Sequence, residues 1–171
     1  VRYARSRQLK VAVRSGGHSM CGSSLHDGGM LIDLSCLDGI SIDVDARTAV
    51  VQPAVTSAAL AYALGEHGLA FPVGHCGTVP MGGYLLAGGL GLNMGAWGGP
   101  ACASMQTIEV ITADGEFVIA DQDHNPDLFW AARGGGPGFF GVVTRFHLRV
   151  YPLPAAIRSS TYVYPLAAVE E

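Results

Sequence analysis

The stretch Arg14-Ser-Gly-Gly-His-Ser19 follows a short apolar run and consists almost entirely of residues that favour tight turns. Glycine adopts backbone angles that other residues avoid, and consecutive N–H groups in such a turn can converge on an anion. We therefore expect a turn suited to a pyrophosphate group. His18 inside this turn is also compatible with a purely structural role, in which its ring closes the loop by a hydrogen bond.

A second glycine-rich loop reads Gly74-His-Cys-Gly-Thr-Val-Pro-Met-Gly-Gly83. Cys76 lies beside Gly77, and a helix is expected to begin near residues 78–80. The positive end of a helix dipole lowers the pKa of a nearby thiol and makes the thiol more reactive. The alternative is that Cys76 is simply a small buried apolar residue.

The composition excludes several classes of protein. The chain has 171 residues and a formal net charge of −4, which fits one domain without the basic face of a nucleic-acid binder. Between Thr48 and Ile108 the only charged side chain is Glu66, which predicts burial on more than one side, against a cofactor or further chain. Residues 79–97 are uncharged, but their many glycines argue against a membrane span.

Other chemistry-bearing patterns are weak. The four cysteines form no CxxC pair, which argues against a zinc ribbon or thioredoxin-type site. A zinc site on His18, Cys21 and His26 lacks a fourth ligand at a suitable spacing. The segment Gly136–Gly141 has GxGxxG spacing, but it follows an expected helix and precedes an expected strand, so we reject a Rossmann turn.

Local patterns predict an α+β fold with strands grouped in hairpins. We expect a helix end within residues 1–9, a helix at 56–67 capped by Thr56, and a short helix at 127–133. Strands are expected at residues 9–13, 30–34, 39–44, 49–53, 105–112, 116–120, 142–151 and 159–164. Propensity alone assigns no structure to the glycine-dense residues 73–99.

Five blocks occur in a fixed order, at residues 14–19, 74–79, 82–91, 127–136 and 141–144. Together they resemble the FAD-binding domain (PCMH type) of berberine bridge enzyme-like flavoproteins, in the vanillyl-alcohol oxidase superfamily. The resemblance covers nearly the whole chain from Val1 to about Pro154. It implies an α+β domain that binds FAD.

The resemblance also assigns the cofactor site residue by residue. It implies that His18 bonds to the 8α-methyl carbon of the isoalloxazine ring and that Cys76 bonds to its C6 atom. The other residues that it places around FAD are Arg14, Ser15, Gly16, Gly17, Ser19, Thr78, Val79, Gly82, Gly83, Tyr84 and Val143.

Within this set the implied roles differ. The serines and glycines of the first loop cradle the pyrophosphate, Gly82 and Gly83 let the backbone approach the ring, and Val143 lies near the adenine. Tyr84 stands near the N1–C2 edge of the ring, where family members often have histidine; tyrosine can donate a hydrogen bond there but cannot carry a positive charge. Met20 and the Pro80-Met81 pair also depart from the family pattern.

The implied activity is that of an FAD-dependent oxidoreductase. A hydride from an alcohol or amine carbon of a carbohydrate or secondary metabolite passes to the flavin, which O2 then reoxidises to give hydrogen peroxide. The oxidase assignment depends on Val79, at a position where valine accompanies oxygen-reactive members. A dehydrogenase with another acceptor, and a flavin-binding module without turnover, remain alternatives. The expected partners are a small-molecule substrate and O2.

The resemblance further implies a domain that is incomplete at both ends. Residues 1–154 correspond to the FAD-binding domain without its N-terminal part, and residues 155–171 to the start of a substrate-binding domain. In the family that second domain supplies the catalytic base, so no catalytic residue is assigned in this chain. Compartment and oligomeric state are left open.

Overall fold

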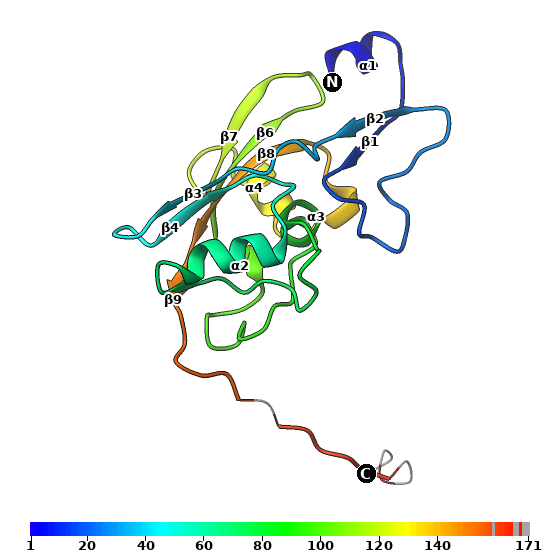
Figure 1. Ribbon diagram of the computed structural model, residues 1–171. Coiled ribbons are helices and arrows are strands. Elements are labelled where there is room, and N and C mark those ends of the chain that lie inside the picture. Colours follow the sequence, from blue (N-terminus) through cyan, green and yellow to red (C-terminus); the bar gives the residue numbers. More distant parts are fainter. Residues whose placement is uncertain (159, 166–167, 169–171) are drawn as a thin grey trace.

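A five-stranded antiparallel sheet forms the centre of the structure (Figure 1). The computed structural model describes residues 1–158, 160–165 and 168. The strand order is β3-β4-β8-β6-β7, with β3 at Ile40–Asp43, β4 at Thr48–Val51, β8 at Val142–Arg149, β6 at Met105–Ile111 and β7 at Phe117–Ala120. The α+β prediction is confirmed.

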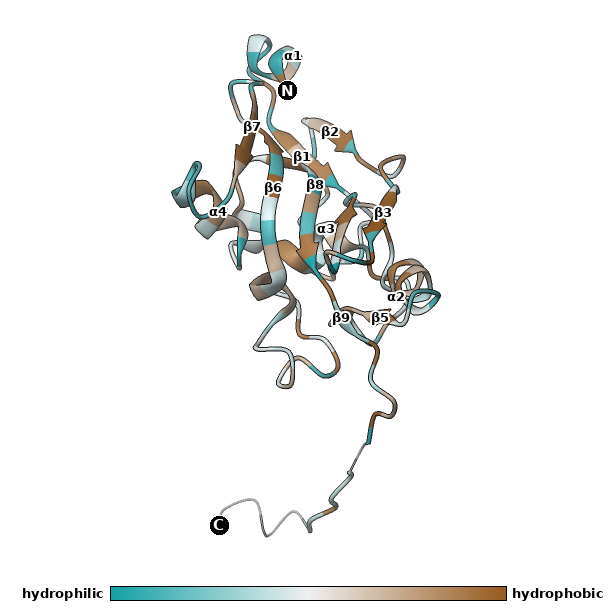
Figure 2. Ribbon diagram, turned by 90° about the vertical axis from the view of Figure 1, so that its left-hand side faces the viewer, coloured by the Kyte–Doolittle hydropathy of each residue, from teal (hydrophilic) through white to brown (hydrophobic). Residues whose placement is uncertain are grey.

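Local turns produce the two hairpins of this sheet. Arg47, with φ of +51°, turns the chain between β3 and β4, and Gly115, with φ of +78°, does the same between β6 and β7. Strand β8 then joins the hairpins by pairing with both β4 and β6. Figure 2 shows apolar and polar residues alternating along β6 and β8. In β8, Phe146 and Leu148 are fully buried, as their alternation predicts.

Short helices flank the sheet. The helices are α1 at Arg2–Ser6, α2 at Ser57–Gly65, α3 at Met81–Leu86 and α4 at Pro126–Ala132. The predicted cap of α2 is confirmed, because the Thr56 hydroxyl accepts a hydrogen bond from the Ala59 N–H at 3.2 Å. Helix α2 packs near β3 at one end of the sheet, and α4 packs near β7 at the other. Their apolar faces close one continuous core.

A parallel pair of strands stands apart from the main sheet (Figure 1). It consists of β1, Val11–Arg14, and β2, Met30–Asp33. Arg14 and Asp33 are register partners, and their side chains form an ion pair at 2.8 Å. The hydrogen bond from Arg14 is the main reason that the pKa of Asp33 lies below its ordinary value. This ion pair fixes the end of β1, from which the Arg14–Ser19 turn departs.

The chain after β8 differs from the prediction. A two-residue strand β9, Tyr151–Pro152, pairs with β5, Leu69–Ala70, which the sequence did not predict. Residues 160–164 have no regular structure, so the predicted strand there is wrong; residue 159 lies outside the described residues. This part of the chain extends away from the sheet (Figures 1 and 2). Among the described residues no strand pairs with it to satisfy its backbone hydrogen bonds.

The glycine-dense region is partly helical. Residues 73–99 contain α3, and a 3₁₀ turn at Ala101–Ser104 follows them. Within the described residues, no helix combines the length and the apolar character needed to cross a membrane. The predicted boundary at residue 154 remains a prediction.

Candidate functional site

A cavity of about 420 Å³ lies between β1, α3 and the start of β8. This volume falls within the range of roughly 300–1,000 Å³ found for ligand pockets. Most of the predicted site residues line it, namely Arg14, Ser15, Gly17, His18, Ser19, Val79, Gly82, Gly83, Tyr84 and Val143. The fold therefore brings residues from both glycine-rich loops and from β8 together in one concave surface.

Two glycines allow the two loops to pack against each other. A methyl group added at Gly82 would stand 2.8 Å from the Ser15 hydroxyl oxygen and 3.0 Å from Pro53 Cβ. One added at Gly16, a predicted site residue that does not line the cavity, would overlap the Pro80 ring. Because neither position has room for a side chain, the close contact between the loops depends on both glycines.

His18 lines this cavity, and it contacts Thr78 and Cys76, two predicted site residues that do not line the cavity themselves. The Thr78 hydroxyl oxygen lies 3.1 Å from His18 Nε2 and 3.2 Å from Cys76 Sγ. The distance from Cys76 Sγ to His18 Nε2 is 3.7 Å, although the two residues are 58 apart in the sequence. Two nucleophilic side chains from separate loops therefore lie side by side.

Hydrogen bonds give Cys76 a more acidic thiol. The side-chain hydrogen bond from Thr78, followed by its backbone hydrogen bond, lowers the pKa of Cys76 below its ordinary value. The predicted direction is confirmed, but the predicted cause is wrong, because α3 begins only at Met81, after the cap residue Pro80. Burial instead raises the pKa of the Cys102 thiol. Because the thiolate is the reactive form of cysteine, Cys76 is the more reactive of the two.

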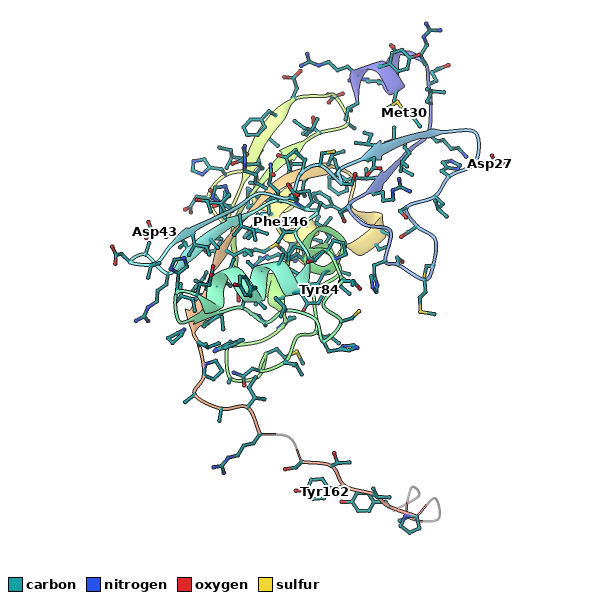
Figure 3. All side chains as sticks on the ribbon, in the orientation of Figure 1. Asp27, Met30, Asp43, Tyr84, Phe146 and Tyr162 are labelled. Atoms are coloured by element: carbon teal, nitrogen blue, oxygen red, sulfur yellow. The ribbon has the colours of Figure 1, made fainter. Side chains whose placement is uncertain are left out.

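Tyr84 connects the cavity wall to the core. Its hydroxyl donates a hydrogen bond of 2.6 Å to the Pro72 carbonyl oxygen, and burial raises its pKa to about 12. Figure 3 shows Tyr84, which belongs to α3, and Phe146 in the interior, while Asp27, Asp43 and Tyr162 lie at the periphery. The single hydroxyl proton of Tyr84 is therefore donated to the Pro72 carbonyl oxygen, whereas the expected acceptor was the isoalloxazine ring.

The structure adds residues that sequence reasoning missed. A 3₁₀ turn at Gly136–Gly138 separates α4 from β8, and it contributes Gly136 and Pro137 to the cavity wall, with Phe139 and Gly141 beyond it. The GxGxxG spacing was the available signal. The segment joins a helix to a strand, so it is not a strand-to-helix Rossmann turn. Its place in the site depends on the fold, in which residues of β1 and β8 line the same cavity.

The zinc alternative is not supported. The described residues contain no group of three or more His, Cys, Asp or Glu side chains that could hold a metal ion. The set of His18, Cys21 and His26 is therefore not such a group. His18 is instead hydrogen-bonded to Thr78.

A turn rich in backbone N–H groups, a glycine-lined cavity and two adjacent nucleophiles define a domain that binds a nucleotide cofactor. Residues 1–121 match the family described as "FAD binding domain". The chain belongs to this family.

Relatives and solved structures agree with that assignment. The chain is 44% identical to the FAD-linked oxidoreductase penO of Penicillium crustosum, over 98% of this chain and 37% of penO. Its structure matches 6-hydroxy-D-nicotine oxidase from Arthrobacter nicotinovorans, with a TM-score of 0.84 and 37% identity over 90% of this chain and 33% of that protein. Berberine bridge enzyme from Eschscholzia californica matches with a TM-score of 0.82 and 35% identity, over 90% and 31% of the two chains.

These matches confirm the resemblance to berberine bridge enzyme-like flavoproteins and the PCMH-type fold. The chain spans 37% of the length of penO and of a second curated relative, the FAD-linked oxidoreductase ptmO of Penicillium ochrochloron.

Proposed function

We propose that this chain is the flavin-binding part of an FAD-dependent oxidoreductase and that it holds FAD covalently, through His18 and also through Cys76. The observation that carries the proposal is the 3.7 Å separation of Cys76 Sγ from Nε2 of His18, which lines the cavity. Side chains this close can reach neighbouring atoms of one planar ring.

The residues present fit this cofactor. The turn at Ser15, Gly17 and Ser19 lines the cavity and offers backbone N–H groups to a pyrophosphate. Gly17 has φ of +68°, an angle that glycine adopts at little cost. Gly83 has open space where a side chain would stand, so the backbone of α3 can approach a flat ring.

The donor chemistry fits as well. A neutral imidazole and a thiolate are nucleophiles able to bond to electron-poor carbon, and Cys76 is the cysteine whose pKa is held low by hydrogen bonds. Covalent attachment through these two side chains would fix the cofactor against the glycine-lined wall.

When bound, FAD accepts a hydride from the substrate, and the protein supplies binding, orientation and electrostatics. We assign the substrate to small molecules that carry an alcohol or amine carbon. The half-buried Val79 lines the cavity, and its short side chain supports the choice of O2 as electron acceptor. The family names of the relatives, an FAD-linked oxidoreductase and a nicotine oxidase, agree with this class of reaction.

Intact mass under denaturing conditions, followed by peptide mapping, tests the attachment. We expect a flavin-sized increment that bridges the His18 and Cys76 peptides. His18→Ala and Cys76→Ala should each leave one bond, whereas Cys36→Ala, at an exposed cysteine away from the cavity, should leave both.

The other outcomes are equally informative. An increment on His18 alone would reduce Cys76 to a structural thiol. A folded chain that shows no increment after incubation with FAD would overturn covalent binding. A chain that carries flavin but whose flavin no alcohol or amine reduces would be a binding module without turnover.

A further inference from the structure

The Thr78 hydroxyl contacts both proposed flavin-bonding side chains. It lies 3.1 Å from His18 Nε2 and 3.2 Å from Cys76 Sγ, both within hydrogen-bond range. The direct distance between sulfur and imidazole is longer, at 3.7 Å. The short route between the two nucleophiles therefore passes through Thr78.

We propose that Thr78 is a positioning residue that relays the Cys76 thiol proton to His18. The thiol proton passes from Sγ to the Thr78 oxygen while the Thr78 hydroxyl proton passes to His18 Nε2. The sulfur becomes a thiolate and the imidazole becomes an imidazolium, so charge is conserved and no electrons are transferred. Because His18 is exposed, it can pass the extra proton on to water.

The donor and acceptor capacities of the three groups allow this transfer. A hydroxyl has one proton to donate and two lone pairs that accept. With the cysteine as a thiol, S–H donates to Thr78 and Thr78 donates to an unprotonated Nε2. With the cysteine as a thiolate, Thr78 donates to the sulfur and accepts from a protonated Nε2. The same heavy-atom positions satisfy every hydrogen bond before and after the transfer.

The arrangement distinguishes Cys76 from the other cysteines. Cys21 and Cys36 are exposed, and Cys102 is buried with a raised pKa, whereas the hydrogen bonds from Thr78 lower the pKa of Cys76. A thiol must lose its proton before it bonds to carbon. The relay thus prepares Cys76 for the bond to flavin, and in this respect the inference rests on the proposed function.

A double-mutant cycle tests the relay in the flavin-free chain. The readout is the rate and pH profile of Cys76 alkylation by iodoacetamide, resolved from the other cysteines by peptide mapping. We expect Thr78→Val to slow alkylation at neutral pH on the order of fivefold, the effect of about one hydrogen bond, and to move the profile to higher pH. His18→Ala should have a similar effect, and the double variant should be no slower than either single variant.

Two further variants serve as controls. Thr78→Ser keeps the hydroxyl and should restore the wild-type pH profile, whereas Thr161→Val removes an exposed hydroxyl elsewhere and should change nothing. Thr78 is exposed, so its substitution is expected to leave the circular dichroism spectrum unchanged. If Thr78→Val did not fold, Thr78→Ala would decide the same question.

The results that would contradict the relay differ from the result that would contradict the proposed function. If His18→Ala still slows alkylation in the Thr78→Val background, the imidazole acts on the sulfur directly and the relay is wrong. An unchanged pH profile in folded Thr78→Val also overturns it. After incubation with FAD, Thr78→Val should keep the His18 bond and lose most of the Cys76 bond. A wild-type chain that takes up no flavin would overturn the proposed function, while the alkylation cycle would still decide the role of Thr78.

Discussion

At the residue scale, Tyr84 shows how burial and hydrogen bonding give one side chain a measurable pH signature. Its hydroxyl proton is held by the Pro72 carbonyl at 2.6 Å, and burial raises its pKa to about 12 from the ordinary value of 10.0. The unfolded chain therefore releases this proton at a lower pH than the folded chain. The neutral hydroxyl therefore adds to the free energy of unfolding, and this contribution is fully present below pH 10 and is lost as the pH rises through about 12.

We predict that Tyr84→Phe lowers the free energy of unfolding by roughly 1 kcal/mol at neutral pH, because the Pro72 carbonyl loses its partner. The variant should also lose less stability than the wild type at alkaline pH. Urea unfolding at a series of pH values measures both effects. Tyr62→Phe, at an exposed tyrosine on α2, is the matched control. Parallel alkaline losses in wild type and Tyr84→Phe would show that the hydroxyl is not protected in the folded state.

At the element scale, helix α3 contains two adjacent glycines in different surroundings. An added methyl group at Gly82 would press on Ser15 and Pro53, whereas one at Gly83 would meet nothing within 4 Å. Alanine is favoured over glycine in a helix by about 1 kcal/mol, so the two substitutions share the same intrinsic gain. Their difference in stability therefore isolates the packing of α3 against Ser15, in the Arg14–Ser19 turn, and against Pro53.

We predict that Gly82→Ala destabilises the chain by roughly 1–3 kcal/mol, as overpacking does, and that Gly83→Ala is neutral or stabilising. Urea unfolding of the two variants checks this. Equal stability in the two variants would mean that the first loop moves away from α3 without cost, and the close contact between the loops would not be needed for the fold.

At the scale of the whole molecule, a ligand in the cavity would contact β1, α3 and β8 at the same time and so would stabilise the folded state. A ligand that binds only the folded state at a hundred times its dissociation constant adds about 2.7 kcal/mol of stability. For a chain of this length that corresponds to a rise in Tm of roughly 5–10 °C.

We predict such a rise when FAD is added to the flavin-free chain, measured by circular dichroism as a function of temperature. NAD, a dinucleotide without an isoalloxazine ring, is the control and should give a much smaller rise. An equal rise with both nucleotides would mean that the site recognises only the shared adenosine and pyrophosphate groups.

The sequence by itself determined those parts of the protein that depend on neighbours along the chain. The two hairpins, the Thr56 cap of α2, and the alternation that buries Phe146 and Leu148 follow from local turns and periodicity, because these signals act over a few residues. The order of five glycine-rich and aromatic blocks identified the FAD-binding family. Most of the predicted cofactor residues also line one cavity.

Only the tertiary structure decided which distant residues meet. The parallel β1–β2 pair and the β5–β9 pair join segments whose own sequences carry no signal for the partner strand. The predicted strand does not form over residues 160–164, beside which the described part of the chain places no other strand. The low pKa of Cys76 comes from Thr78 rather than from a helix end, and the proton of Tyr84 goes to Pro72. Hydrogen-bond partners and packing contacts depend on distance in space, which spacing along the chain does not fix.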